Sequence, residues 1–155
     1  MALREQFTDQ LKEAMKAKDN RRVSTLRMVL AALKDKDIAA RTETSREGIS
    51  DDDVLGLLAK MVKQREESAA AYRAGNRPEL VQSEEEEIAI IRSFMPKQMS
   101  VDEAKAAIAA VIAETGASSV KDMGKVMNTL KERFAGQMDF GKASGMTKDL
   151  LSAPK

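Results

Sequence analysis

The chain has 155 residues, of which 43% are hydrophobic and 33% are charged, and its formal net charge is +1. It contains no cysteine and no histidine, which excludes disulfides, thiolate nucleophiles, the usual zinc ligands and the one side chain whose ordinary pKa lies near neutrality. Catalysis would have to rest on carboxylates, lysines or hydroxyl groups, and a site for a polyanion would have to be a local patch.

The N-terminal segment MALREQFTDQLKEAMKAKD carries charges from its fourth residue, and the chain has no apolar run of the length, about 18 residues, that a transmembrane helix needs. These features argue against a signal peptide and a membrane span. We therefore expect a cytoplasmic protein without a membrane partner. Its aromatic fraction of 3% is low for a protein that stacks single-stranded bases on exposed rings.

Apolar residues recur every three or four positions in the first part of the chain, which predicts four amphipathic helices. Their expected first residues are close to Leu3, Asn20, Ser50 and Pro78. The second helix is apolar on most sides in TLRMVLAAL, so we expect it to be central. Residues 39–50 are polar and unpatterned, and we expect them to form a mobile connection before the third helix, which ends at Gly75-Asn76.

Pro96 interrupts the helical pattern and predicts a hinge between an N-terminal domain, residues 1–96, and a C-terminal domain, residues 97–155. Ser100 and Glu103 form a capping box for a fifth helix that ends at Gly116. A sixth helix is expected from Ser118 or Ser119 to Gly136, and Asp139 can cap a seventh. No segment has the pattern of a strand. The sequence predicts an all-α fold, with a four-helix N-terminal part followed by a small three-helix C-terminal domain.

The pair Gly124-Lys125 raises the question of a phosphate-binding loop. Such a loop has four residues between its first glycine and the Gly-Lys pair, then Ser or Thr, and it follows a strand. Here seven residues separate Gly116 from Gly124, and Val126 follows the lysine. We interpret Gly124 as a residue inside the sixth helix, where close approach of another helix would explain a glycine.

No catalytic residue, metal site or cofactor is predicted. The serine in GKASG is misplaced for a nucleophile elbow, and a pairing of Ser118 or Ser119 with Lys121 lacks an oxyanion loop. Acidic residues 51–53 and 84–87 lack the alternating pattern of a calcium loop. We interpret the first group as a helix first turn and the second as a solvated helix face.

Basic residues gather in two places. One cluster crowds the first helix junction: Lys16, Lys18, Arg21, Arg22 and Arg27. In the sixth helix Lys121 and Lys125 lie opposite the apolar stripe and Lys131 lies towards its flank, while Lys142 begins the seventh helix. Such a face can bind RNA phosphates. A solvated surface is the alternative interpretation.

Four stretches, in order, carry a family resemblance: LKEAMKAKDNRRVSTLRMVLAALKDKDI, KQREESAAAYRAGNRPELVQSEEEEIAII, MPKQMS and ETGASSVKDMGKVMNTL. Together they resemble the GatB/YqeY family, in its free-standing YqeY-like form, from about Leu3 to Leu151. The resemblance implies a two-part helical fold and kinship with the C-terminal tail of the GatB subunit of aspartyl/glutamyl-tRNA amidotransferase. That tail is associated with holding tRNA, whereas the chemistry of the amidotransferase lies in other domains.

The leading hypothesis is thus a non-catalytic tRNA- or RNA-associated module with phosphate contacts from Lys121, Lys125, Lys131 and Lys142. Two alternatives stay open. One is an adaptor that docks on an amidotransferase or another translation protein through methionine-rich faces formed by Met123, Met127 and Met146. The other is a carbon-nitrogen ligase with glutamine as amido donor, against which the missing cysteine, histidine and nucleotide loop argue.

Overall fold

The computed structural model describes residues 2–41 and 48–152. Within these ranges the regular structure consists of seven α-helices and one short 3-10 turn, without a strand. The prediction of an all-α fold is confirmed. The chain divides into two compact units, Met1–Met95 and Pro96–Lys155, and each is described by itself.

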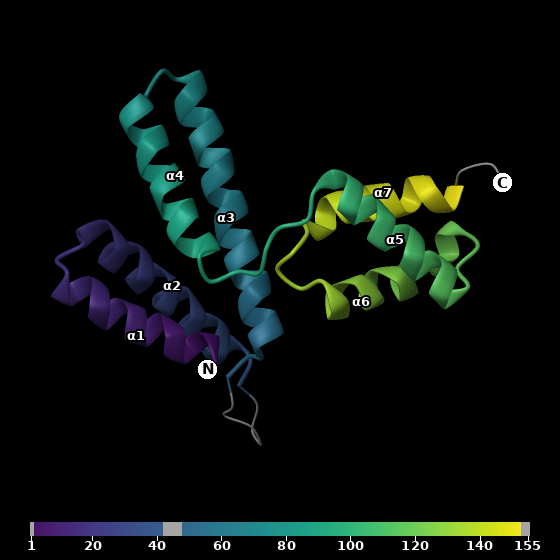
Figure 1. Cartoon of the computed structure of the whole chain (residues 1–155), viewed down its shortest axis with the longest axis horizontal. Helices are drawn as coiled ribbons and strands as arrows, with labels where there is room; N and C mark the ends of the chain where they lie inside the picture. The colour runs from purple at the N-terminus through teal and green to yellow at the C-terminus, as the bar shows by residue number, and fades with distance from the viewer. Residues whose placement is uncertain (1, 42–47, 153–155) are drawn as a thin grey trace. The chain divides into compact units, whose positions relative to one another are not determined.

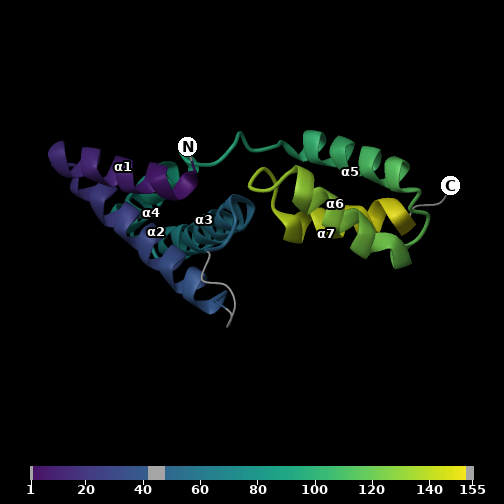
Figure 2. The ribbon, with the colours of Figure 1, turned by 90° about the horizontal axis from the view of Figure 1, so that it is seen from below.

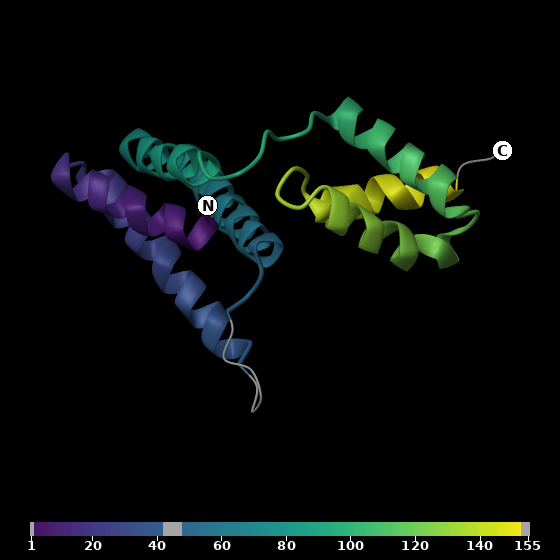
Figure 3. The ribbon, with the colours of Figure 1, turned by 60° about the horizontal axis from the view of Figure 1, so that its bottom comes forward.

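The first unit consists of two helical hairpins. α1 (Leu3–Lys16) and α2 (Asn20–Ala39) form one, and α3 (Asp51–Ala74) and α4 (Pro78–Arg92) form the other (Figure 1). Figure 3 shows α1 lying along α2. α2 contacts each of the other three helices, as its apolar sides predict.

The core of the first unit draws on all four helices. Its buried side chains are Leu3, Phe7, Val29, Leu33, Val54, Leu57, Leu58, Met61, Val62, Ile88 and Ile91. Phe7 is fully buried and packs edge-on against Phe94, with 5.0 Å between the ring centroids. Because burying a side chain of this size contributes about 1.5–3 kcal/mol, this cluster is the main force that packs the two hairpins together.

The segment before α3 is held in place by an ion pair. Arg4 Nη1 and Nη2 donate to Asp37 Oδ2 and Oδ1 at 2.6 and 2.9 Å. Arg4 Nη2 also donates to the carbonyl of Ile49 at 2.7 Å, and the Ile49 N–H donates to Asp37 Oδ1 at 2.9 Å. The prediction of a mobile connection is therefore wrong for residues 48–50, while residues 42–47 lie outside the described residues.

The second unit contains α5 (Val101–Thr115), α6 (Met123–Arg133) and α7 (Phe140–Ser152), and each helix contacts the other two (Figure 2). A 3-10 turn, Val120–Asp122, precedes α6. The buried core is formed by Ala104, Ile108, Val111, Val126, Leu130, Met138 and Ala143.

Local capping interactions set the helix ends of this unit. Ser100 Oγ accepts from the Glu103 N–H at 3.1 Å, and the Glu103 carboxylate accepts from the Ser100 N–H at 3.2 Å, which confirms the predicted capping box. Gly116 ends α5 in the left-handed region, with φ 69°. Asp139 Oδ1 accepts the N–H of Gly141 at 2.8 Å and so caps α7.

α6 covers Met123–Arg133, so it is shorter than the predicted span from Ser118 or Ser119 to Gly136, although Ser119 is the N-cap of the 3-10 turn that leads into α6. The Asp122 carboxylate accepts the N–H groups of Ser118 and Ser119 at 2.9 and 3.3 Å, which holds these residues outside the helix. The explanation offered for Gly124 is also wrong, because a Cβ there would meet no described atom within 4 Å.

The residues around Pro96 belong to separate cores. Met95 packs against the first core and Met99 against the second. The Met99 N–H donates to the carbonyl of Gln137 at 2.9 Å, and the side chain of Gln98 donates to the carbonyl of Gly136. Gln98 is thus tied to the second unit, and its side chain also donates to the carbonyl of Pro96 at 3.1 Å.

Candidate nucleic-acid interface

The four lysines predicted to contact phosphates lie on adjoining elements of the second unit. Lys121 is in the 3-10 turn, Lys125 and Lys131 are in α6, and Lys142 is in the first turn of α7, and all four are exposed. The 3-10 turn and α6 both contact α7. Lys125 and Lys131 nevertheless point to different sides of α6, because successive residues turn by about 100° around a helix. The four lysines therefore form a scattered set rather than a row.

Lys125 has a structural contact that its sequence context did not predict. Its Nζ donates to the carbonyl of Thr115 at 3.0 Å, at the last turn of α5. A cation at this position interacts favourably with the negative end of the helix dipole. An ammonium group has three donors, so Lys125 can hold the end of α5 and still reach a phosphate oxygen.

Three of the seven carboxylates of the second unit are directed to helix starts. Glu103, Asp122 and Asp139 each accept main-chain N–H groups there. The Ser100 N–H lowers the pKa of Glu103, and the N–H groups of Ser118 and Ser119 lower the pKa of Asp122. Glu103 and Asp122 thus stay ionised near neutral pH, and both accept hydrogen bonds from backbone donors.

The result is an excess of unpaired cations. Residues 96–155 contain nine Lys and Arg and seven Asp and Glu. Three of the carboxylates cap helices and Glu114 pairs with Arg133. Within the described residues, Lys121, Lys131 and Lys142 make no ion pair. These lysines are thus available to an anion from outside.

The basic cluster at the first helix junction is used differently. Arg21 pairs with Glu86 at 3.2 Å and with Glu87 at 3.7 Å. Arg22 donates to the Gln10 side chain at 3.0 Å and lies over the Phe94 ring, 5.9 Å from its centroid. Both arginines therefore join elements of the first unit.

The acidic run at residues 84–87 also takes part in this packing. Arg65 Nε donates to Glu87 Oε2 at 3.0 Å, and the two side chains are only 14% and 16% exposed. The prediction of a merely solvated face is wrong for Glu87, because that carboxylate joins α4 to α3 and, through Arg21, to α2.

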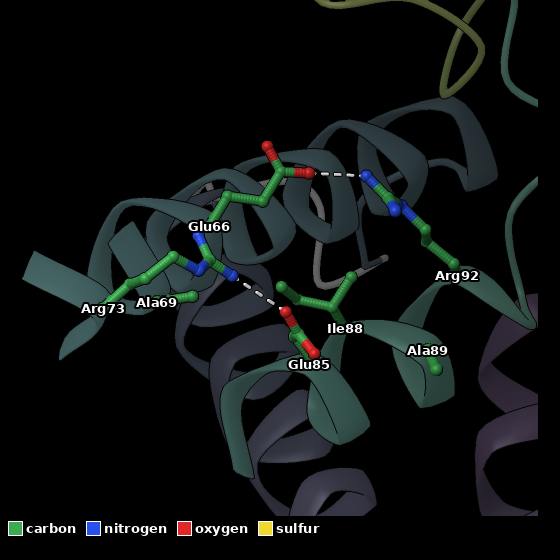
Figure 4. Close-up of a pocket in the computed structure, with 7 residues that line it drawn as sticks. All are labelled: Glu66, Ala69, Arg73, Glu85, Ile88, Ala89 and Arg92. Atoms are coloured by element: carbon green, nitrogen blue, oxygen red, sulfur yellow. Dashed lines mark hydrogen bonds and ion pairs between the residues drawn. The ribbon is translucent and has the colours of Figure 1, made fainter. Parts of the chain in front are cut away.

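A shallow hollow of about 520 Å³ between α3 and α4 was not predicted (Figure 4). Its charged residues are Glu66, Arg73, Glu85 and Arg92, and its floor is formed by Ala69, Ile88 and Ala89. We call this surface the α3–α4 face. One signal that could have revealed it is the pattern Glu-Glu-x-x-Ala-x-x-Arg, which occurs at residues 66–73 and again at residues 85–92.

Among residues 2–41 and 48–152, no group of three or more carboxylates is arranged so that it could hold a metal ion. No helix in the same ranges has the length and apolar character needed to cross a bilayer.

The sequence model of the Yqey-like protein family matches residues 4–151. The chain belongs to this family. Membership confirms the resemblance seen in the four sequence stretches, and it covers both units.

The chain is also similar to proteins named "Altered inheritance of mitochondria protein 41, mitochondrial". It is 36% identical to the one from Lachancea thermotolerans over 95 residues, which are 61% of this chain and 49% of the relative. It is 33% identical to the Vanderwaltozyma polyspora protein over 85 residues, 55% and 44% of the two chains. It is 36% identical to the Kluyveromyces lactis protein over 84 residues, which are 54% of this chain and 43% of the relative.

The chain spans less than half the length of these curated relatives. Their name refers to mitochondria, so a cytoplasmic location for this chain stays a prediction.

Proposed function

We propose that the second unit is a non-catalytic RNA-binding module that contacts phosphates through Lys121, Lys125, Lys131 and Lys142. The observation that supports it most directly is that Lys121, Lys131 and Lys142 are exposed and make no ion pair among the described residues, while three of the unit's seven carboxylates cap helices. The resemblance to the tail of the GatB subunit of aspartyl/glutamyl-tRNA amidotransferase favours tRNA as the RNA, and an amidotransferase or another translation protein as a further partner.

The mode of binding follows from the side chains that are exposed. Lysine offers a flexible point charge that suits phosphate oxygens, and phosphate contacts position an RNA without reading its sequence. Phe134 and Phe140 pack against the second core and form no stacking platform. We therefore expect recognition of backbone and shape, with strong salt dependence and little base preference.

The packing of the methionines gives the adaptor alternative less support. Met127 and Met146 pack against the second core, and the Met127 sulfur lies 3.7 Å from the Thr147 hydroxyl oxygen. Core filling accounts for both side chains. The ligase alternative predicts that the purified chain alone releases ammonia from glutamine or consumes ATP with Glu-tRNA, and we expect neither reaction.

The test is a titration of the full chain with tRNA at about 50 mM and about 200 mM salt. We expect binding at the lower concentration and a steep loss at the higher one. The double variant Lys121→Glu and Lys142→Glu should weaken binding and reduce the slope of log affinity against log salt by about 2, one unit for each lost phosphate contact. This variant leaves Lys125 on the end of α5.

The matched control is Lys12→Glu with Lys34→Glu, which changes the net charge equally on exposed positions of α1 and α2. We expect it to leave the salt slope near that of the unmodified chain. Equal losses in the two double variants would show that only overall charge matters, and no binding at about 50 mM salt would remove bare tRNA as the ligand.

A further inference from the structure

Charges alternate around the α3–α4 face. Each helix supplies a glutamate and, seven residues later, an arginine: Glu66 and Arg73 from α3, Glu85 and Arg92 from α4. The helices form an antiparallel hairpin, so Glu66 pairs with Arg92 at one end and Arg73 pairs with Glu85 at 3.0 Å at the other (Figure 4). These four charged residues form the corners of the hollow, and side chains at neighbouring corners thus carry charges of opposite sign.

The floor between the two ion pairs is apolar and low. Ala69 and Ile88 are 4% and 7% exposed, while Ala89 is exposed. The small exposed side chain of Ala89 lets another backbone approach closely, so the four charged residues can come within reach of charges on a facing surface.

The four corner residues have unused hydrogen-bonding capacity. Their side chains are between 48% and 63% exposed, and each arginine uses one terminal nitrogen for its partner glutamate. A guanidinium has five N–H donors and a carboxylate can accept several hydrogen bonds. Each corner can therefore bind a second group of opposite charge without giving up the first.

Such a pattern is complementary to a copy of itself. When a second face is laid on it by a two-fold rotation about an axis in the plane of contact, along the helices or across them, every glutamate meets an arginine. A polyanion such as RNA would instead meet two carboxylates, and any surface of one sign would be repelled at two of the four corners. We propose that the α3–α4 face is an isologous dimer interface whose occupant is a second copy of this chain.

Sedimentation equilibrium of the full chain between about 1 μM and about 1 mM tests this directly. The expected result is a monomer–dimer equilibrium that weakens as salt screens the corner charges. A chain that stays monomeric to the highest concentration at low salt would overturn the proposal.

The first variant is Ala89→Arg, which places a large charged side chain on the floor at an exposed position and keeps both ion pairs. We expect its dimer dissociation constant to rise at least about tenfold. Ala71→Arg, also exposed on α3 but on the opposite side of that helix, is the matched control and should dimerise normally. A dimer that withstands Ala89→Arg uses another surface, and the proposal is then wrong.

The second test exploits the charge pattern. Arg73→Glu with Arg92→Glu makes all four corners acidic, and Glu66→Arg with Glu85→Arg makes them basic. Each double variant should be monomeric by itself, and an equimolar mixture should dimerise again, since every corner then meets its opposite in either orientation. Circular dichroism checks that both variants fold. Folded variants that dimerise separately, or that fail to associate when mixed, would contradict an interface formed by the alternating charges of the α3–α4 face.

Discussion

The two units of this protein direct their carboxylates to different groups. In the first unit glutamates and aspartates form ion pairs between helices, as in Arg4–Asp37 and Arg65–Glu87. In the second unit three of them, Glu103, Asp122 and Asp139, accept main-chain N–H groups at the starts of helices, and Glu114 forms an ion pair with Arg133. The first arrangement neutralises arginines and joins helices. The second leaves Lys121, Lys131 and Lys142 without an ion pair, which supports our proposal of a polyanion site in the second unit.

The largest expected effect comes from the partly buried pair in the first unit. Glu87→Ala would leave Arg65 with little solvent and no carboxylate, and we expect a loss of about 2–3 kcal/mol in the free energy of unfolding. Tyr72, the only tyrosine in a chain without tryptophan, reports unfolding of this unit by its fluorescence in urea. The control Glu86→Ala removes a side chain that is 45% exposed, so its cost should be below about 1 kcal/mol. Equal costs would show that burial does not distinguish the two glutamates.

A smaller loss is expected where Gly48 passes the Arg4–Asp37 pair. A Cβ there would lie 2.4 Å from Arg4 Nη2 and 2.6 Å from Asp37 Oδ1, so Gly48→Ala must displace the ion pair. We expect a cost of about 1 kcal/mol or less in urea unfolding, because the atoms that must move are the ends of flexible side chains. Gly56→Ala is the control, because a Cβ at Gly56 meets nothing within 4 Å. It should be neutral or stabilising, since alanine favours a helix.

In the second unit two glycines should respond with opposite signs. Gly116 has φ 69° at the end of α5, so Gly116→Ala should destabilise the unit by about 1 kcal/mol. Gly124 lies inside α6 with open space around it, so Gly124→Ala should stabilise the unit by up to about 1 kcal/mol. Native-state hydrogen exchange of α5 and α6 measures both changes. A loss of stability in Gly124→Ala would mean that its surroundings are crowded after all.

The smallest effect is a pH dependence of the first unit. The Arg4 guanidinium lowers the pKa of Asp37 in the folded chain. The stability that the Arg4–Asp37 pair contributes is therefore complete above the unfolded pKa of Asp, about 4, and is lost as the pH falls through the lower pKa of Asp37 in the folded chain. Asp37→Asn should be less stable than the unmodified chain at neutral pH by about 1 kcal/mol or less, and the gap should close in acid. A gap that stays constant from neutral to acid pH would show that the ion pair is not its cause.

The sequence alone determined the helices and most of their ends. Amphipathic spacing and caps such as Ser100 with Glu103 are interactions between residues three or four positions apart, so they can be seen in the linear order. The same local information placed Lys125 and Lys131 on the sixth helix and Lys142 on the seventh, whereas Lys121 lies in the 3-10 turn before α6. It also carried the family membership.

Only the tertiary structure decided which charges are neutralised. Whether Glu87 meets Arg65, whether Lys125 reaches the carbonyl of Thr115, and whether Gly48 touches Arg4 depend on how separate helices pack. The α3–α4 face arises in the same way, because its two matching patterns lie on different helices and become one surface only when the hairpin closes. Contacts between residues far apart in the chain follow from the burial of the core, and no local pattern of residues encodes them.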